Sequence, residues 1–116
     1  MSREVALNRF IDHTLLNPVS SIQDLKRVCE EALKYQFKSV CIPPFYVEKA
    51  AELLFSSDTA VSTVIGFPLG YSDPKVKLFE VKEALKMGAE ELDIVINQNL
   101  LQSGEYDQLH NEMLSI

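Results

Sequence analysis

Hydrophobic and polar residues alternate along the chain with two spacings, one typical of helices and the other typical of buried strands. Behind Ser21, apolar residues recur every three to four positions, and Asp24 follows the serine at the spacing of a capped helix start. This helical pattern stops near Phe37. The run 39–42 is β-prone and is closed by Pro43-Pro44, which continues neither a helix nor the interior of a sheet. The pattern therefore predicts an amphipathic helix followed by a buried strand.

The same alternation fills the rest of the chain. Ser72 or Asp73 can cap a later helix, Pro74 suits its first turn and Gly88 suits its C-terminal stop. The apolar positions of that helix are Leu78, Val81, Leu85 and Met87. The other predicted elements are strands over 10–14, 61–65 and 91–97 and helices over 47–55 and from about residue 105 onward. The chain therefore consists of successive βα units.

Alternation of strands and helices indicates a parallel sheet with right-handed crossovers. An open doubly wound sheet has a phosphate loop with glycine after its first strand, whereas the turn 15–19 contains no glycine. A (β/α)₈ barrel has eight units and about 250 residues, and this chain of 116 residues has half of them. We therefore predict an α/β fold, the first four βα units of a parallel TIM barrel. Residues 1–116 form this half barrel, with no second domain.

Composition and charge argue against several classes of partner. The chain has 11 Lys and Arg against 17 Asp and Glu, a net charge of −6, and no basic cluster, so we expect no nucleic acid partner. The N-terminus resembles neither a signal peptide nor a membrane span, so we expect no membrane association and a cytoplasmic location. Cys29 and Cys41 form no CxxC pair and lie near no histidine at ligand spacing, which argues against zinc and against a disulfide. We expect reduced thiols and no cofactor.

Asp93 is the leading candidate for chemistry, because active sites of parallel barrels gather at the C-terminal ends of the strands. Strand alternation puts Leu92, Ile94 and Ile96 on the helix side and turns Asp93 into the barrel. We predict a buried aspartate there. It acts either as a general acid or base, which we favour, or as a structural acid that bridges two strands.

Asp12 and Cys41 are predicted to point inward as well. Asp12, near the top of the first strand, either takes part in catalysis or only holds the following turn by local hydrogen bonds. Cys41 is either a small hydrophobic residue, which we favour, or a nucleophile. His13 is expected on the helix side and His110 on the last helix, so no Cys/His or Ser/His/Asp set can be assembled.

Four motifs at the predicted strands occur in a characteristic order. They are Asp12-His13-Thr14-Leu15-Leu16, Val40-Cys41-Ile42-Pro43-Pro44, Thr63-Val64-Ile65-Gly66-Phe67-Pro68-Leu69-Gly70 and Gly88-Ala89-Glu90-Glu91-Leu92-Asp93-Ile94-Val95-Ile96-Asn97. Together they resemble the deoxyribose-phosphate aldolases, class I aldolases built on the (β/α)₈ barrel. The resemblance implies cleavage of 2-deoxyribose 5-phosphate to glyceraldehyde 3-phosphate and acetaldehyde, through a Schiff base on a lysine and without a metal.

The resemblance also implies roles for individual residues. Asp93 would donate and accept protons beside the lysines, and Asp12 would help the proton relay. The residues that it places near the substrate are Cys41, Thr14 and Leu16.

The chain departs from that family in one large respect. The family's Schiff-base lysine lies on the sixth strand, a second essential lysine on the seventh, and its phosphate-binding backbone on the last strands, none of which are present here. The lysines that are present, Lys26, Lys34, Lys38, Lys49, Lys75, Lys77, Lys82 and Lys86, are expected on helices or before the second strand, facing solvent or the wrong end of the barrel. We therefore expect the isolated chain to be a truncated, catalytically inactive form.

A half barrel has two edge strands, which favour pairing with another chain. We expect either a homo-oligomer or a complex with a complementing C-terminal half. A competing hypothesis is a non-enzymatic half-barrel remnant or interaction module that self-associates through these edges. A third hypothesis, an open binding domain of flavodoxin type, is disfavoured by the glycine-free first turn.

Overall fold

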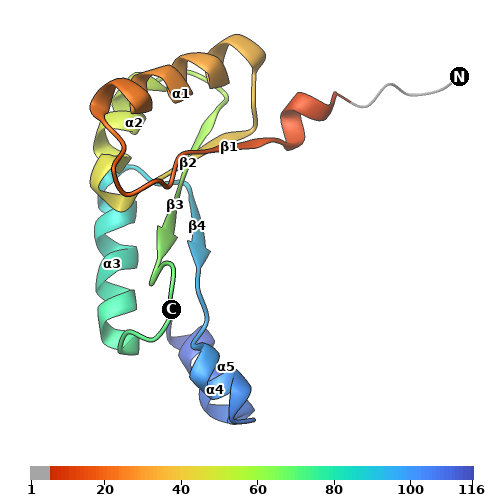
Figure 1. Cartoon of the computed structure of the whole chain (residues 1–116), viewed down its shortest axis with the longest axis vertical. Helices are drawn as coiled ribbons and strands as arrows, with labels where there is room; N and C mark the ends of the chain where they lie inside the picture. Colours follow the sequence, from red (N-terminus) through yellow and green to blue (C-terminus); the bar gives the residue numbers. More distant parts are fainter. Residues whose placement is uncertain (1–5) are drawn as a thin grey trace, which may run out of the picture.

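A four-stranded parallel sheet flanked by helices forms the structure, a computed structural model that describes residues 6–116 (Figure 1). The strands are β1 (Asp12–Thr14), β2 (Ser39–Ile42), β3 (Ala60–Ile65) and β4 (Glu91–Ile94). The α-helices are α1 (Ile22–Tyr35), α2 (Val47–Leu53), α3 (Pro74–Met87), α4 (Gln98–Gln102) and α5 (Tyr106–Ser115), and 3₁₀ helices cover Leu7–Phe10 and Pro44–Tyr46. The predicted α/β alternation is confirmed. None of the helices in this part of the chain has the length and apolar character needed to cross a membrane.

The strands lie side by side in the order in which the chain forms them, and each neighbouring pair is parallel. This sequential order is that of a barrel wall. A doubly wound sheet reverses its strand order partway across and carries helices on both faces, whereas α1, α2 and α3 lie on the same side of the sheet (Figure 1). For residues 6–116, this topology excludes the flavodoxin-type alternative.

The two faces of the sheet differ in chemical character. The strand residues that face the helices, Val40, Ile42, Val61 and Ile65, are at most 2% exposed and share a core with residues of α1, α2 and α3. The alternate positions, which point away from the helices, carry Asp12, Thr14, Ser39, Cys41, Ser62, Val64 and Asp93. One face is therefore built for packing, and the other is mostly polar.

The helix boundaries follow the capping signals in the sequence. Ser21 caps α1 in a complete capping box, in which Asp24 N donates to the serine side chain and Ser21 N donates to the Asp24 carboxylate. Asp73 caps α3, and Pro74 occupies its first turn. Gly88 ends the helix at a φ of 112°, in the left-handed region that glycine adopts without a Cβ clash. These predictions are confirmed.

The first and fourth strands are shorter than predicted, because a strand extends only as far as its neighbour does. Phe10 lies in a 3₁₀ helix and not in β1, since β2 begins at Ser39, opposite Asp12. β4 ends at Ile94, whose partner Ile65 is the last residue of β3. The predicted bounds 10–14 and 91–97 were therefore too long.

The short helix α4 was not predicted, although its start signal is present in the sequence. Asn97 is the N-cap residue, and its side-chain oxygen accepts hydrogen bonds from Asn99 N at 3.0 Å and from Leu100 N at 3.2 Å. Because Asn97 was assigned to the end of the fourth strand, its role as a helix cap was not predicted.

The buried stripe of α3 contains a lysine. Lys77 is 1% exposed and lines up with Val81 and Ala84, whereas Leu85, a predicted core position, is 52% exposed. The prediction that every lysine faces solvent or the wrong end of the barrel is therefore wrong for Lys77. Its Nζ donates to the Val95 carbonyl oxygen at 2.8 Å and to an oxygen of Glu112 on α5 at 2.9 Å. Helical spacing could not reveal this partner, which lies 35 residues further along the chain.

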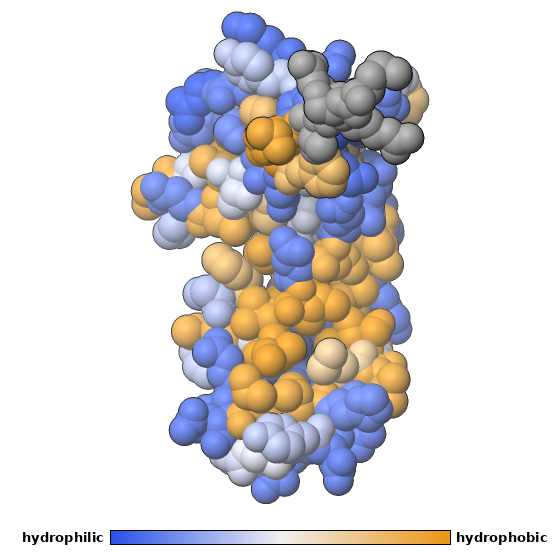
Figure 2. Space-filling view, turned by 90° about the vertical axis from the view of Figure 1, so that its right-hand side faces the viewer, coloured by the Kyte–Doolittle hydropathy of each residue, from blue (hydrophilic) through white to orange (hydrophobic). Residues whose placement is uncertain are grey.

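Apolar surface is exposed along the free edge of β4. Figure 2 shows hydrophobic surface gathered over the lower half of one side of the molecule. Leu92 packs against the core as predicted, but Ile94 is 39% exposed, because β4 is an edge strand. A pocket of about 170 Å³ between β4 and α5 is lined by Ile94, Ile96 and Met113, among others. As predicted, β1 and β4 are both edges, and β4 leaves apolar surface uncovered.

Replacing Lys77 with methionine should destabilise the fold by about 3–5 kcal/mol, because it leaves the Glu112 carboxylate buried without its cation. Urea unfolding followed by circular dichroism measures the change. The double variant Lys77→Met/Glu112→Leu should recover most of the loss, since it removes both charges. Lys75→Met on the exposed side of α3 is the matched control, with a change below about 0.5 kcal/mol. Equal destabilisation by Lys77→Met and by the control would contradict the assigned role of the ion pair.

Candidate active site

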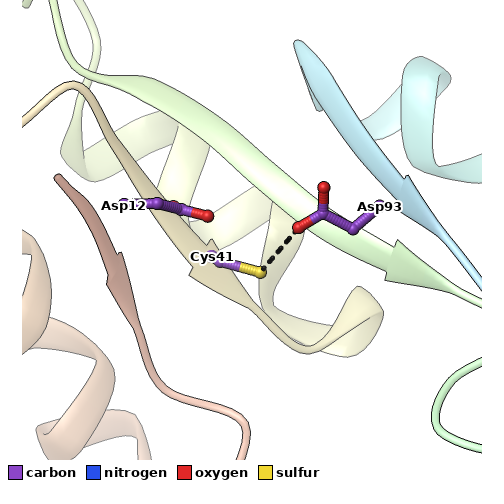
Figure 3. Close-up of side chains that lie close together, drawn as sticks. All are labelled: Asp12, Cys41 and Asp93. Carbon is purple, nitrogen blue, oxygen red and sulfur yellow. Dashed lines mark hydrogen bonds between the residues drawn. The ribbon is translucent and has the colours of Figure 1, made fainter. Parts of the chain in front are cut away.

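Asp12, Cys41 and Asp93 converge on the open face of the sheet (Figure 3). One carboxylate oxygen of each aspartate and the cysteine sulfur all lie within 4.8 Å of one another. The Cys41 thiol donates a weak hydrogen bond to an Asp93 oxygen, Oδ2, at 3.8 Å. The three residues come from β1, β2 and β4. The prediction that they share the inner face is therefore confirmed, and the structure brings them together at one point.

Strand register places these side chains. In the parallel ladder Thr14 pairs with Cys41, Cys41 with Ser62, and Val64 with Asp93, so the paired residues point to the same face. Thr14 is exposed beside Cys41. A register shift of one residue in any of these strands would turn its site residue into the helix layer.

Asp12 is held by a neighbouring strand and not by a turn. Its Oδ1 accepts a hydrogen bond from the Ser39 hydroxyl at 2.7 Å, across the β1–β2 pair. The local hydrogen bond nearby, from the Thr14 hydroxyl, goes to the Asp12 backbone carbonyl at 3.0 Å and not to its carboxylate. Asp12 is also the first residue of β1, which corrects the prediction that it stands near the top of that strand. Ser39 was not predicted as the partner of Asp12, although it lies on the same face of β2 as Cys41.

The exposure of the three side chains differs from the prediction. Cys41 is 2% exposed, whereas Asp12 and Asp93 are exposed. The prediction of a buried Asp93 on a central strand is therefore wrong for this chain. The reason is that β4 is an edge of the sheet, and nothing in residues 6–116 covers the face to which Asp93 points.

Burial and two nearby carboxylates hold the Cys41 thiol in its protonated form. Burial raises the pKa of Cys41 to about 11, and the negative charges of Asp12 and Asp93 contribute in the same direction. A thiol with this pKa is a poor nucleophile at neutral pH. The interpretation of Cys41 as a small buried residue agrees with its surroundings better than a nucleophilic role does.

Leu16 lines a groove formed by the loops that follow the strands. The groove has a volume of about 320 Å³. Its other lining residues are Pro18, Pro43, Pro44, Val64, Phe67, Pro68 and Glu80. Val64 pairs with Asp93 in the sheet, so the groove and the cluster adjoin. The combination of a mostly apolar groove with adjoining carboxylates can hold a small molecule and exchange protons with it.

The histidines lie outside this site. His13 points to the helix side, where its Nε2 lies 3.1 Å from a Glu31 oxygen and its ring lies 5.1 Å from that of Phe37. His110 is on α5. These positions confirm the prediction for both residues and leave the cluster without a histidine base.

Four parallel strands in sequential order, helices on one face and carboxylates on the other define half of a (β/α)₈ barrel with a candidate acid–base site. The sequence profile of the DeoC/LacD family aldolases matches residues 7–116. The chain belongs to this family.

Relatives and solved structures agree with the match. The deoxyribose-phosphate aldolase of Metamycoplasma hominis is 49% identical over 110 residues, 95% of this chain and 51% of that protein. A crystal structure from Coccidioides immitis gives a TM-score of 0.93 at 33% identity and covers 95% of this chain and 44% of that one. The structure of the deoxyribose phosphate aldolase of Aeropyrum pernix matches with a TM-score of 0.77 at 33% sequence identity. The match covers 91% of this chain and 48% of that one. The predicted family resemblance is confirmed, and the chain spans about half the length of these relatives.

Alkylation of Cys41 by iodoacetamide at pH 8 should be about a hundredfold slower than that of an ordinary thiol, because its pKa is raised from 9.0 to about 11. The rate should keep rising with pH up to about 11. Peptide mapping by mass spectrometry separates Cys41 from Cys29. Asp93→Asn should speed the reaction of Cys41 several-fold and leave Cys29, on α1, unchanged. A rate that levels off near pH 9 would contradict the raised pKa.

Proposed function

We propose that this chain supplies the proton-transfer side of a class I aldolase site, and that the Schiff-base lysine comes from outside residues 1–116. The proposed substrate is 2-deoxyribose 5-phosphate, cleaved to glyceraldehyde 3-phosphate and acetaldehyde, by analogy with the M. hominis relative. The convergence of Asp12 and Asp93 on one open face is the observation that carries the proposal.

In class I aldolase chemistry a lysine amine forms an iminium with the substrate carbonyl, and the iminium accepts the electron pair of the breaking carbon–carbon bond. Proton transfers accompany both steps. We propose that Asp93, exposed on the open face, donates and accepts these protons, and that Asp12, oriented by Ser39, relays them. Cys41 and Thr14 would lie beside the substrate, and Leu16 would contact it in the groove.

The lysines of this chain do not suit the nucleophilic role. Lys77 is buried, but its amine is paired with Glu112 on the helix side of the sheet. The other lysines, Lys26, Lys34, Lys38, Lys49, Lys75, Lys82 and Lys86, are exposed. An exposed amine lacks the desolvating pocket that activates a Schiff-base lysine, so it is a poor nucleophile. We therefore propose that the 116-residue chain is inactive by itself.

The partner that fits the open face is a second half barrel. β1 and β4 both have unpaired edges, and the polar face lacks an opposing wall in the part of the chain that the structure describes. A complementing half would pair with both edges and bring its lysines toward Asp12 and Asp93. A homo-oligomer is the second arrangement that we propose, and the A. pernix relative, described as tetrameric, supports assembly within the family. The two buried free thiols, Cys29 and Cys41, support a reducing, cytoplasmic setting.

Mixing this chain with the part of the M. hominis aldolase that lies outside the match should produce retro-aldol activity that neither fragment has alone. Release of acetaldehyde, coupled to an alcohol dehydrogenase, measures it. In the active mixture Asp93→Asn should lower kcat/KM by about 10²- to 10⁴-fold, because general acid–base catalysis is lost. Asp107→Asn on the exposed start of α5 is the matched control and should leave the rate unchanged. Activity that survives Asp93→Asn would overturn the assigned role.

The chain alone should self-associate at high concentration, because its edge strands are unpaired. Light scattering should give a mass above that of the monomer, and addition of the complementing fragment should replace this species with a one-to-one complex. A clean monomer at high concentration would count against self-association.

A further inference from the structure

Glu80 is an acidic residue of the groove that the proposed mechanism does not use. It lies on α3, is half-buried, and lines the groove together with Phe67 and Pro68, among others. The ion pairs found in residues 6–116 do not involve its carboxylate. Its Oε1 instead accepts a hydrogen bond from the backbone N–H of Gly66 at 2.8 Å. The charge of Glu80 is therefore directed at the loop that follows β3, residues 66–70.

This hydrogen bond fixes the start of the loop. Gly66 directly follows Ile65, the last residue of β3, and directly precedes the two groove residues Phe67 and Pro68. A hydrogen bond that an N–H donates to a carboxylate is roughly twice as strong as one to a neutral acceptor. Phe67 is 48% exposed, so packing in the core does not fix its position. The direction of the backbone at Gly66 therefore determines where these two side chains lie.

A second residue of α3 restrains Gly66. Lys77 precedes Glu80 by one helical turn, so the two side chains lie on the same face of the helix. A Cβ on Gly66 would lie 2.9 Å from Lys77 Cε, and the φ of Gly66 is 65°, in the left-handed region that favours glycine. Lys77 is itself held by Val95 and Glu112. The loop therefore starts between a fixed lysine side chain and the Glu80 carboxylate.

The other end of the loop is restrained by the segment that follows β4. Gly70 N donates to the Gly66 carbonyl oxygen at 2.7 Å, and a Cβ on Gly70 would collide with the carbonyl oxygen of Ile96. The side chain of Gln98, the first residue of α4, donates to the Leu69 carbonyl oxygen at 3.2 Å. Both ends of the loop are therefore held, and the groove has a preformed wall.

We infer that Glu80 is a positioning residue: by holding the N–H of Gly66, it fixes the wall on which Phe67 and Pro68 meet the substrate. The inference rests on the proposed function for the identity of that substrate. Without this hydrogen bond the loop must be ordered when the substrate binds, which weakens binding. Proton transfer at Asp93, which lies on β4, should change much less. Loss of the Glu80 carboxylate therefore acts on KM more than on kcat.

Amide hydrogen exchange, followed by NMR on the intact chain, tests the hydrogen bond without any activity. In Glu80→Ala the Gly66 amide should exchange about tenfold faster or more, because its acceptor is lost. Glu80→Gln keeps an acceptor oxygen and should keep most of the protection. Glu83→Ala, on the same helix, is the matched control, and unchanged exchange of the β3 amides shows that the fold is intact. Equal exchange of Gly66 in the wild type and in Glu80→Ala would overturn the inference.

Kinetics of the mixture of this chain with the complementing fragment provide the second readout. Glu80→Ala should raise KM several-fold and change kcat by less than about twofold, and Glu80→Gln should restore the wild-type KM. A merely structural defect would instead reduce the amount of active complex and therefore kcat. An unchanged KM, or a loss confined to kcat, would overturn the inference. If the wild-type mixture is inactive, the proposed function fails, and the exchange measurement still decides whether Glu80 holds the loop.

Discussion

In the four-stranded parallel sheet, every second side chain points toward the helices and the others point away from them. Burial against α1, α2 and α3 requires the helix-facing positions to be apolar, as Val40 and Ile65 are. The same register turns Asp12, Cys41 and Asp93 to the opposite face, where they meet. Core and candidate site therefore depend on one constraint, and a strand cannot slip by one residue without losing both.

The positions of β1 and β4 at the edges of the sheet determine which of its surfaces are covered and which are exposed. β4 pairs with β3 alone, yet the buried Lys77–Glu112 ion pair attaches α5 to α3, and the same lysine binds the carbonyl of Val95 just after the strand. The last βα unit is thereby held in place without a fifth strand. The inner face has no comparable cover in residues 6–116, which leaves Asp93 exposed. The chain spans about half the length of its aldolase relatives, such as that of M. hominis, in keeping with this open face.

Local signals predicted much of this architecture. The Ser21 capping box, Asp73 and Gly88 fixed helix ends that the structure confirms, and alternation assigned Asp93 and Cys41 to the correct face. The failures concern interactions between distant segments. The burial of Lys77 depends on a carboxylate 35 residues away, and the exposure of Asp93 follows from the position of β4 at the edge of the sheet, with no strand of residues 6–116 beyond it. Neither follows from periodicity, since the periodicity of one element does not show what packs against it.

Borohydride trapping tests the central claim most directly, namely that this chain contributes proton transfer and a partner contributes the lysine. The chain and the complementing fragment of the M. hominis aldolase are incubated together with acetaldehyde, reduced, and weighed by intact-mass spectrometry. The account predicts one stoichiometric reduced adduct on the complementing fragment, and on this chain only the background of exposed lysines. A stoichiometric adduct on this chain, at a single lysine, would contradict it.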